Sequence, residues 1–226
     1  MVDFNHFLLY NIICKGDDYM AKKVVGIKNM EINIKKGEID MKSNKPKLII
    51  VEGAIGSGKS SLAHNLRENM KNTTMLSLSS IGNDDKNNSY MYHANMLNMI
   101  MDSKTFNSNF ILCRSFISNE VYNRLGKKDY DNSENFQLLT YKLEVLQYYY
   151  DVKVIILTSN PNEYERRLGR RDKFEYVKHT VDEALKQQRT YMLLSDELRE
   201  KHIPVEVINN SGISKKQLCD YVVNNL

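Results

Sequence analysis

A short apolar segment runs directly into a glycine-rich loop at residues 47–61, which read KLIIVEGAIGSGKSS. The loop fits the pattern G-x-x-x-x-G-K-[ST], in which Gly53 and Gly58 are the fixed glycines and Lys59 and Ser60 close the motif. Glycines here let backbone N–H groups turn inward around an anion, because no Cβ atom blocks the approach. A helix that starts at the loop adds the positive end of its dipole. The pattern therefore predicts a phosphate-binding loop.

The flanking segments have the character that such a loop requires. Residues 48–51 form a continuous apolar run, typical of a central parallel strand that is covered on both faces. After the loop, Leu62, Leu66 and Met70 recur at helical spacing. Strand, loop and helix follow in the expected order, which favours a phosphate site over a glycine turn without a ligand.

The loop itself supplies the predicted nucleotide site. We expect Lys59 to reach the β and γ phosphates of ATP and to act in catalysis, and the Ser60 hydroxyl to ligate Mg²⁺. The residues expected to contact the nucleotide are Gly53, Ala54, Ile55, Gly56, Ser57, Gly58, Lys59, Ser60 and Ser61.

Composition limits the class of partner. The chain has 226 residues and a net charge of +4, which is enough for anionic small molecules and gives no reason to expect polymeric nucleic acid or a membrane. Three cysteines, Cys14, Cys113 and Cys219, lie far apart without a C-x-x-C pair, so we expect neither zinc nor a disulfide framework. The apolar stretch at residues 7–10 is too short to span a bilayer, and we expect a cytoplasmic protein.

Two regions are predicted along the chain. Residues 1–45 form an N-terminal extension, in which alternating apolar residues from Met30 onward favour a β-hairpin. In residues 46–226 strands and helices alternate, which predicts an α/β domain with a five-stranded parallel sheet flanked by helices. The expected strands are 47–52, 73–79, 110–113, 152–157 and 205–208. The expected helices are near 59–71, 90–102, 115–125, 136–150, 162–169, 174–199 and 214–224.

Two further motifs follow strands. Arg114 and Ser115 come directly after the strand at 110–113, and Ser118 and Tyr122 follow at short spacing. A basic segment after the strand at 152–157 contains Arg166, Arg167, Arg170, Arg171, Asp172, Phe174 and Glu175.

Taken with the loop, these motifs resemble the P-loop nucleoside and nucleotide kinases, and most of all the thymidylate kinases. The resemblance implies a three-layer P-loop kinase fold, ATP and Mg²⁺ as cofactors, a nucleotide or nucleoside as the small-molecule substrate, and a homodimer. It implies an arginine-rich lid in which Arg167 and Arg170 reach the transferred phosphoryl group and Asp172 tethers the lid. It also implies that residues 209–212 pass over the adenine of ATP.

Arg114 is the third predicted catalytic group beside Lys59 and the lid arginines. At the carboxyl end of its strand, beside the loop, its guanidinium can bridge the phosphates of donor and acceptor. Two positions depart from the family pattern: Cys113 stands where the family has an acid before this arginine, and residues 79–85 lack the usual Glu-Pro segment. We expect Cys113 to be a small buried residue.

Three hypotheses for the reaction remain open. A monophosphate acceptor is already anionic and needs no base, whereas a nucleoside 5′-hydroxyl needs a carboxylate to take its proton. Cys113 in place of an acid favours the monophosphate and phosphorylation of dTMP to dTDP. Asp84 or Asp85 could still act as base in a deoxynucleoside kinase. The third hypothesis is a catalytically degenerate nucleotide-binding protein.

Overall fold

The computed structural model describes residues 30–35, 38–43, 45–77, 86–127, 133–171 and 179–226. The chain divides into two units, Met1–Lys42 and Ser43–Leu226. Strands β1 (Met30–Lys35) and β2 (Glu38–Ser43) pair with each other in a two-stranded sheet, in the segment for which the sequence favours a hairpin.

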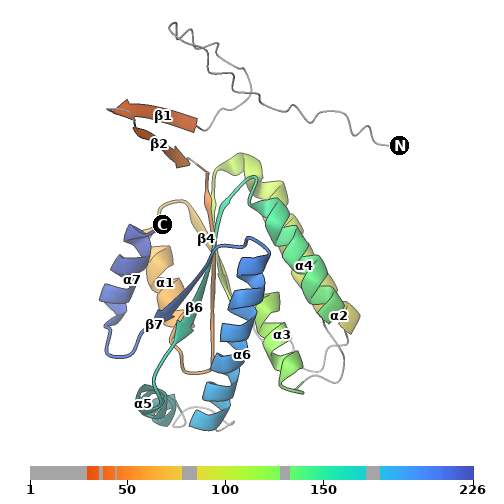
Figure 1. Cartoon of the computed structure of the whole chain (residues 1–226), viewed down its shortest axis with the longest axis vertical. Helices are drawn as coiled ribbons and strands as arrows, with labels where there is room; N and C mark the ends of the chain where they lie inside the picture. The colour runs from red at the N-terminus through yellow and green to blue at the C-terminus, as the bar shows by residue number, and fades with distance from the viewer. Residues whose placement is uncertain (1–29, 36–37, 44, 78–85, 128–132, 172–178) are drawn as a thin grey trace, which may run out of the picture. The chain divides into compact units, whose positions relative to one another are not determined.

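The second unit is built on a sheet of five parallel strands in the order β4-β5-β3-β6-β7 (Figure 1). The strands are β3 (Lys47–Gly53), β4 (Thr73–Ser77), β5 (Asn109–Cys113), β6 (Asp151–Thr158) and β7 (Val205–Asn209). The predicted five-stranded parallel sheet is therefore confirmed. Because β3 lies in the middle, with β5 on one side and β6 on the other, the strand order reverses beside it. Ligands of open α/β sheets bind outside the carboxyl ends of the strands at such a point.

Helices cover both faces of this sheet (Figure 1). On one face lie α1 (Lys59–Asn69) and α7 (Lys215–Asn224), which pack against each other. The other face carries α2 (Lys86–Asp102), α3 (Phe116–Arg124), α4 (Ser133–Leu146) and α6 (Val181–Glu200). Helix α5 (Pro161–Arg171) follows β6, and its Tyr164 and Leu168 pack against Ala54 and Ile55 of the loop.

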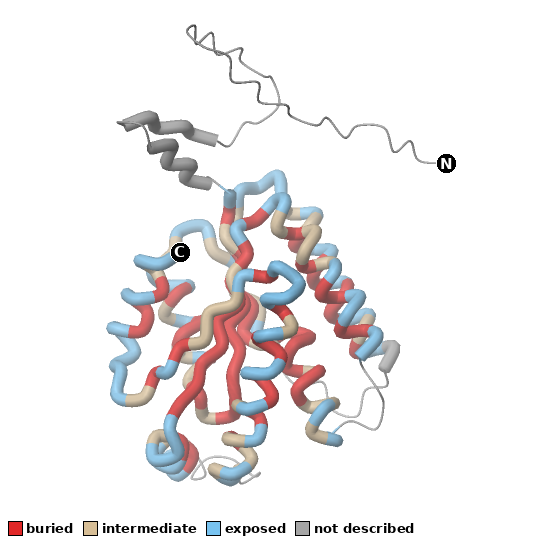
Figure 2. Tube along the Cα trace, viewed as in Figure 1, coloured by how far each residue is buried: buried red, intermediate tan, exposed pale blue. Residues whose placement is uncertain are grey.

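Strand β3 is buried along most of its length, as the apolar run predicts (Figure 2). Ile49 and Val51 belong to the core under α1 and α7, whereas Leu48 and Ile50 belong to the core on the opposite face. Alternate side chains of a strand point to opposite faces, so one strand contributes to both cores. The next residue, Glu52, is a fully buried carboxylate.

Several element boundaries differ from the predicted ones. Helix α2 begins at Lys86, four positions before the expected start. Helix α6 begins at Val181 because Thr180 caps it: the Thr180 hydroxyl accepts from the Glu183 amide, and the Glu183 carboxylate accepts from the Thr180 amide. The predicted elements at 73–79 and 174–199 extend partly into residues outside the described ranges.

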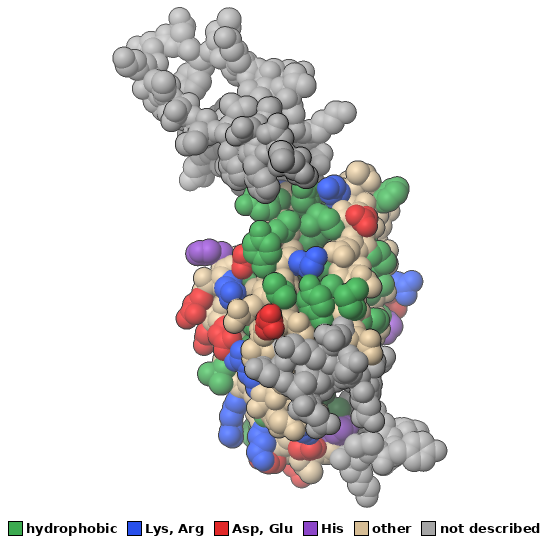
Figure 3. Space-filling model, turned by 90° about the vertical axis from the view of Figure 1, so that its right-hand side faces the viewer, with side chains coloured by type: hydrophobic (Ala, Val, Ile, Leu, Met, Phe, Trp, Pro, Cys, Tyr) green, Lys and Arg blue, Asp and Glu red, His purple; other side chains and the backbone are tan. Residues whose placement is uncertain are grey.

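Large apolar side chains gather on the side of the second unit where α2 and α4 lie (Figure 3). Met91 and Met99 of α2 and Leu138 and Tyr141 of α4 are exposed, and we call these four residues the α2–α4 surface. The two helices are neighbours, since Lys142 Nζ donates to Asn98 Oδ1 at 3.0 Å. In the described ranges, no helix is long and apolar enough to cross a membrane.

Candidate active site

The phosphate-binding loop leaves β3 at a position that only glycine can occupy. Gly53 has φ +143°, and a Cβ atom there would lie 2.6 Å from the Leu157 carbonyl oxygen and 2.7 Å from Ser57 Oγ. Gly56 and Gly58 also have positive φ, at 76° and 91°, and Gly58 is the N-cap of α1. The glycines of the sequence motif therefore adopt the left-handed conformations that the motif predicts.

Lys59 reaches back across this loop from the first turn of α1. Its Nζ donates to the Ala54 carbonyl oxygen at 3.1 Å, and the residue is only 6% exposed. Ser60, the next residue, is exposed at the helix N-terminus. Ser57 Oγ is buried in the loop and has no hydrogen-bond partner among the described residues. The loop thus presents a nearly buried ammonium group and an open helix end, which suit a phosphate chain.

A cavity of about 490 Å³ opens in front of the loop. Of the nine predicted nucleotide contacts, Gly56, Gly58, Lys59, Ser60 and Ser61 line it, whereas Gly53, Ala54, Ile55 and Ser57 do not. The Ile55 amide instead donates to Gln187 Oε1 at 2.9 Å. The other charged lining residues are Arg114, Arg166, Arg167, Arg170 and Lys215, against one acid, Glu163. This excess of positive charge favours an anionic ligand.

Arg114 occupies the single position between β5 and the N-cap of α3, Ser115. Its backbone is left-handed, with φ +72°, which costs about 1–2 kcal/mol for a residue with a Cβ atom. Its amide donates to the Val51 carbonyl oxygen at 3.1 Å, so the strained turn is attached to β3. The side chain lines the cavity, and among the described residues it has no hydrogen-bond partner. Backbone strain of this kind is typical of functional positions.

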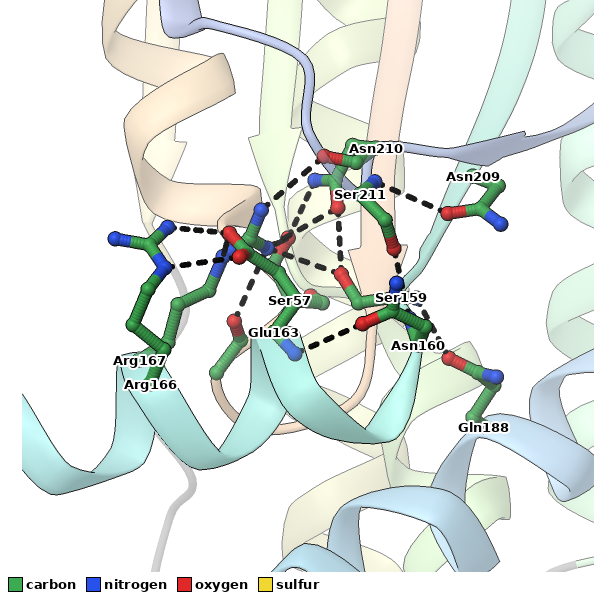
Figure 4. A network of polar contacts seen from close by, with 11 residues as sticks. Ser57, Ser159, Asn160, Glu163, Arg166, Arg167, Gln188, Asn209, Asn210 and Ser211 are labelled. Atoms are coloured by element: carbon green, nitrogen blue, oxygen red, sulfur yellow. Dashed lines mark hydrogen bonds and ion pairs between the residues drawn. The ribbon is translucent and has the colours of Figure 1, made fainter.

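Arg167 lies at the centre of a polar network around the outside of the loop (Figure 4). Its Nη1 donates to the carbonyl oxygens of Ser57 at 2.9 Å and Gly56 at 3.3 Å. The same nitrogen lies 3.1 Å from Ser159 Oγ and 3.1 Å from Asn210 Oδ1. The guanidinium thereby joins the loop to the residues that follow β6 and β7.

The contacts of three side chains in this network were not predicted from the sequence, although Asn210 belongs to the segment 209–212 that the resemblance places over the adenine. Asn210 is buried, and its Nδ2 donates to the Ser57 carbonyl oxygen at 2.7 Å. Ser159 Oγ donates to Asn210 Oδ1 at 2.6 Å, and the Ser159 amide donates to Gln188 Oε1 at 2.9 Å. For Ser159 and Asn210 the available signal was their place just after predicted strands, where polar residues meet at one edge of the sheet. Gln188 lies within α6, where its sequence position gave no such signal.

Glu163 pairs with Arg166 and Arg167 of the same helix. It accepts from Arg166 Nε at 2.9 Å and from Arg167 Nε at 2.6 Å. The bonds from Arg166, and after them those from Arg167, lower the pKa of Glu163 to about 2, although burial opposes the change. Arg170 also lines the cavity and has no polar partner among the described residues. The side chain of Arg171, and Asp172, Phe174 and Glu175, lie outside the residues described.

Glu52 forms a second buried network on the other side of the loop. Ser115 Oγ donates to Glu52 Oε1 at 2.7 Å, while Ser118 Oγ and Tyr191 OH donate to Oε2 at 2.5 and 3.1 Å. Burial raises the pKa of Glu52, and the bonds from the two serines only partly oppose this. Glu52 has no role among the predictions made from the sequence, although a single acid at the end of an apolar strand was a usable signal.

Cys113 is buried, as expected, and its Sγ lies 3.7 Å from Ser60 Oγ.

No group of three or more His, Cys, Asp or Glu side chains that could hold a metal occurs in the described part of the chain. The Ser60 hydroxyl, the predicted Mg²⁺ ligand, lines the cavity beside the loop. This fits an ion that is held mainly by substrate phosphates and water. The predicted departure from the family pattern at residues 79–85, and with it the alternative bases Asp84 and Asp85, lies outside the described ranges.

Neither a family model nor a curated protein matches the sequence. Solved structures do match the fold. One is thymidylate kinase from Candida albicans, at 16% identity and a TM-score of 0.55, over 80% of this chain and 91% of that one. Another is deoxyadenosine kinase from M. mycoides, with its products dCMP and dCDP bound, at 14% identity and a TM-score of 0.51, over 79% of this chain and 97% of that one. The chain therefore has the P-loop nucleotide kinase fold.

The Glu163 pair predicts a stability difference that depends on pH. The folded-state pKa of about 2 lies below the ordinary 4.5, so the unfolded chain binds more protons between these values. The stabilisation by Glu163 is then complete above pH 4.5 and is lost as pH falls towards 2. In urea unfolding at pH 7, 5, 4 and 3.5, we expect Glu163→Gln to be destabilised at the two higher pH values, and its difference from wild type to become smaller at the two lower ones.

The matched control is Glu165→Gln, which removes an exposed carboxylate from the same helix. It should show little difference from wild type at pH 7. An equal destabilisation of Glu163→Gln at every pH would contradict the assignment of the charge pair.

Proposed function

We propose that this protein is an ATP- and Mg²⁺-dependent phosphotransferase that phosphorylates a nucleoside monophosphate, with dTMP converted to dTDP. The observation that carries the proposal is the arrangement of the loop, in which Lys59 and the N-terminus of α1 face a cavity lined by several arginines. Phosphoryl transfer depends mainly on positioning and on neutralisation of charge, and these are the properties that this cavity supplies. The similarity in fold to a thymidylate kinase supports the same reaction class.

The proposed roles follow from where each cation lies. Lys59 and the loop amides hold the phosphates of ATP, and Ser60 is a ligand of Mg²⁺, which when bound neutralises charge on the β and γ phosphates. Arg114 and Arg170 line the cavity without polar partners among the described residues, so both are available to the transferred phosphoryl group. Arg167 is bound to the Gly56 and Ser57 carbonyls, and we propose that it acts in catalysis by holding the loop in place.

The carboxylates favour a monophosphate as acceptor. Glu163 is the only acid that lines the cavity within the described residues, and with a pKa of about 2 it is a poor proton acceptor. Both oxygens of Glu52 already accept hydrogen bonds. A phosphate acceptor needs neither group as a base, whereas a deoxynucleoside acceptor would require one from another part of the chain.

A panel of acceptors tests the proposal. ADP release from Mg-ATP is measured with dTMP, with other nucleoside monophosphates, and with free deoxynucleosides. We expect turnover with dTMP and none with thymidine or deoxyadenosine. Turnover with a deoxynucleoside alone would support the deoxynucleoside kinase alternative. Binding of Mg-ATP without turnover on any acceptor would support the degenerate protein, for which Cys113 in place of an acid is the motivating observation.

Lys59→Ala should lower turnover by at least about 10²-fold, because it removes the ammonium group that donates to the Ala54 carbonyl of the loop. Circular dichroism and thermal unfolding establish that the variant is folded. Lys71→Ala, which removes an exposed lysine outside the cavity, is the matched control. Turnover of Lys59→Ala equal to that of the control would overturn the role of Lys59.

We also propose that the protein acts in the cytoplasm.

We propose, in addition, that two copies of the chain associate through the α2–α4 surface. Four large apolar side chains exposed together on neighbouring helices suit a two-fold interface, in which each copy presents the same surface. We expect Tyr141→Glu to shift sedimentation from dimer to monomer. Leu193→Glu, an exposed position on α6, is the control and should leave the dimer intact. A wild-type protein that stays monomeric at all concentrations would refute the interface.

A further inference from the structure

Glu52 is a buried carboxylate that the proposed reaction does not use directly. It is the last residue before Gly53 in the central strand and has no exposed surface. Its two oxygens accept from three hydroxyl groups, those of Ser115, Ser118 and Tyr191. A carboxylate taken out of water is costly unless its oxygens are satisfied, so three converging donors indicate a site built to hold it.

The turn that carries Arg114 is attached to β3 at two points. The Arg114 amide donates to the Val51 carbonyl oxygen at 3.1 Å, and the next hydroxyl, Ser115 Oγ, donates to Glu52 Oε1 at 2.7 Å. Two consecutive residues of the β5–α3 turn are thus attached to two consecutive residues of β3. The same Ser115 oxygen accepts from the Ile117 amide at 3.2 Å and caps α3.

This double attachment coincides with the strained position in the turn. Arg114 has φ +72°, and strained conformations persist only where their surroundings determine them. The direction of its side chain follows from that backbone conformation. Among the described residues the guanidinium has no polar partner, so its position depends on the turn that carries it.

We propose that Glu52 is a positioning residue for Arg114, which it holds toward the cavity through Ser115. The inference rests on the proposed phosphoryl transfer, in which Arg114 contacts the phosphates. A displacement of a catalytic group by about 1 Å can cost about 10²-fold in rate. Loss of the Glu52 carboxylate should therefore reduce the chemical step more than it reduces the binding of ATP.

The first experiment is a double-mutant cycle on kcat with Mg-ATP and the acceptor that the panel identifies. Glu52→Gln should lower kcat by about 10- to 100-fold, with the Kd of Mg-ATP measured by calorimetry nearly unchanged. In the Arg114→Ala background the same change should have no further effect on kcat, because the group that it positions is gone. An undiminished effect of Glu52→Gln in that background would overturn the proposal.

A second pair of variants separates positioning from general stability. Ser115→Ala and Tyr191→Phe each remove one hydroxyl donor to Glu52, but only Ser115 is adjacent in sequence to Arg114. Ser115→Ala should reproduce the loss in kcat, and Tyr191→Phe should leave kcat within about twofold of wild type. Equal losses in both variants, in proportion to their loss of thermal stability, would show that the network is only structural. This pair decides the question even if Glu52→Gln does not fold.

A third measurement does not depend on catalysis. The Arg114 side-chain Nε signal is assigned in a ¹⁵N NMR spectrum by its disappearance in Arg114→Ala. We expect Glu52→Gln and Ser115→Ala to move or broaden this signal, and Tyr191→Phe to leave it in place. An unchanged signal in Ser115→Ala would refute the positioning role. Absence of turnover on every acceptor, with the signal changing as expected, would instead refute the proposed function alone.

Discussion

The close approach of the Gly53 backbone to the Leu157 carbonyl determines where the phosphate-binding loop leaves β3. Strands β3 and β6 pair in parallel as far as Gly53 and Leu157. The loop therefore begins beside a residue of β6 that is still part of the sheet. Any side chain at Gly53 would push the two strands apart. The glycine therefore couples the loop to the packing of the sheet, and the position of Lys59 follows from that coupling because α1 starts at the end of the loop.

A loop that turns amide groups toward an anion must also satisfy the carbonyl groups that point the other way. Here Arg167 and the Asn210 carboxamide donate to the carbonyl oxygens of Gly56 and Ser57. Arg167 is in turn held by Glu163, whose charge offsets that of the guanidinium. Helix α5 thus supplies both an anchor for the loop and, at Arg170, a cation that lines the cavity. Arg167 and Arg170 thus have different contacts, although both lie on α5 and line the cavity.

The sequence predicted most of the fold and the loop because both depend on local patterns. The apolar run at residues 48–51 and the glycine spacing are readable without knowledge of partners, and the parallel sheet follows from the alternation of elements. The networks around Arg167 and Glu52 were not predicted, because each joins residues from three or more separate segments. The place of Arg166, Arg167 and Arg170 in one basic segment did not show which of them binds protein carbonyls.

The carboxylates of Glu52 and Glu163 illustrate why residue type alone does not identify a base. Burial raises the pKa of Glu52, whereas the arginines lower that of Glu163 to about 2. A raised pKa would suit a general base, but the oxygens of Glu52 are enclosed by three hydroxyl groups and the residue has no exposed surface. Glu163 lines the cavity, but its two arginine partners keep it ionised and weakly basic. Access and basicity are therefore separated in this site, and that separation is the physical reason to favour an acceptor that is already an anion.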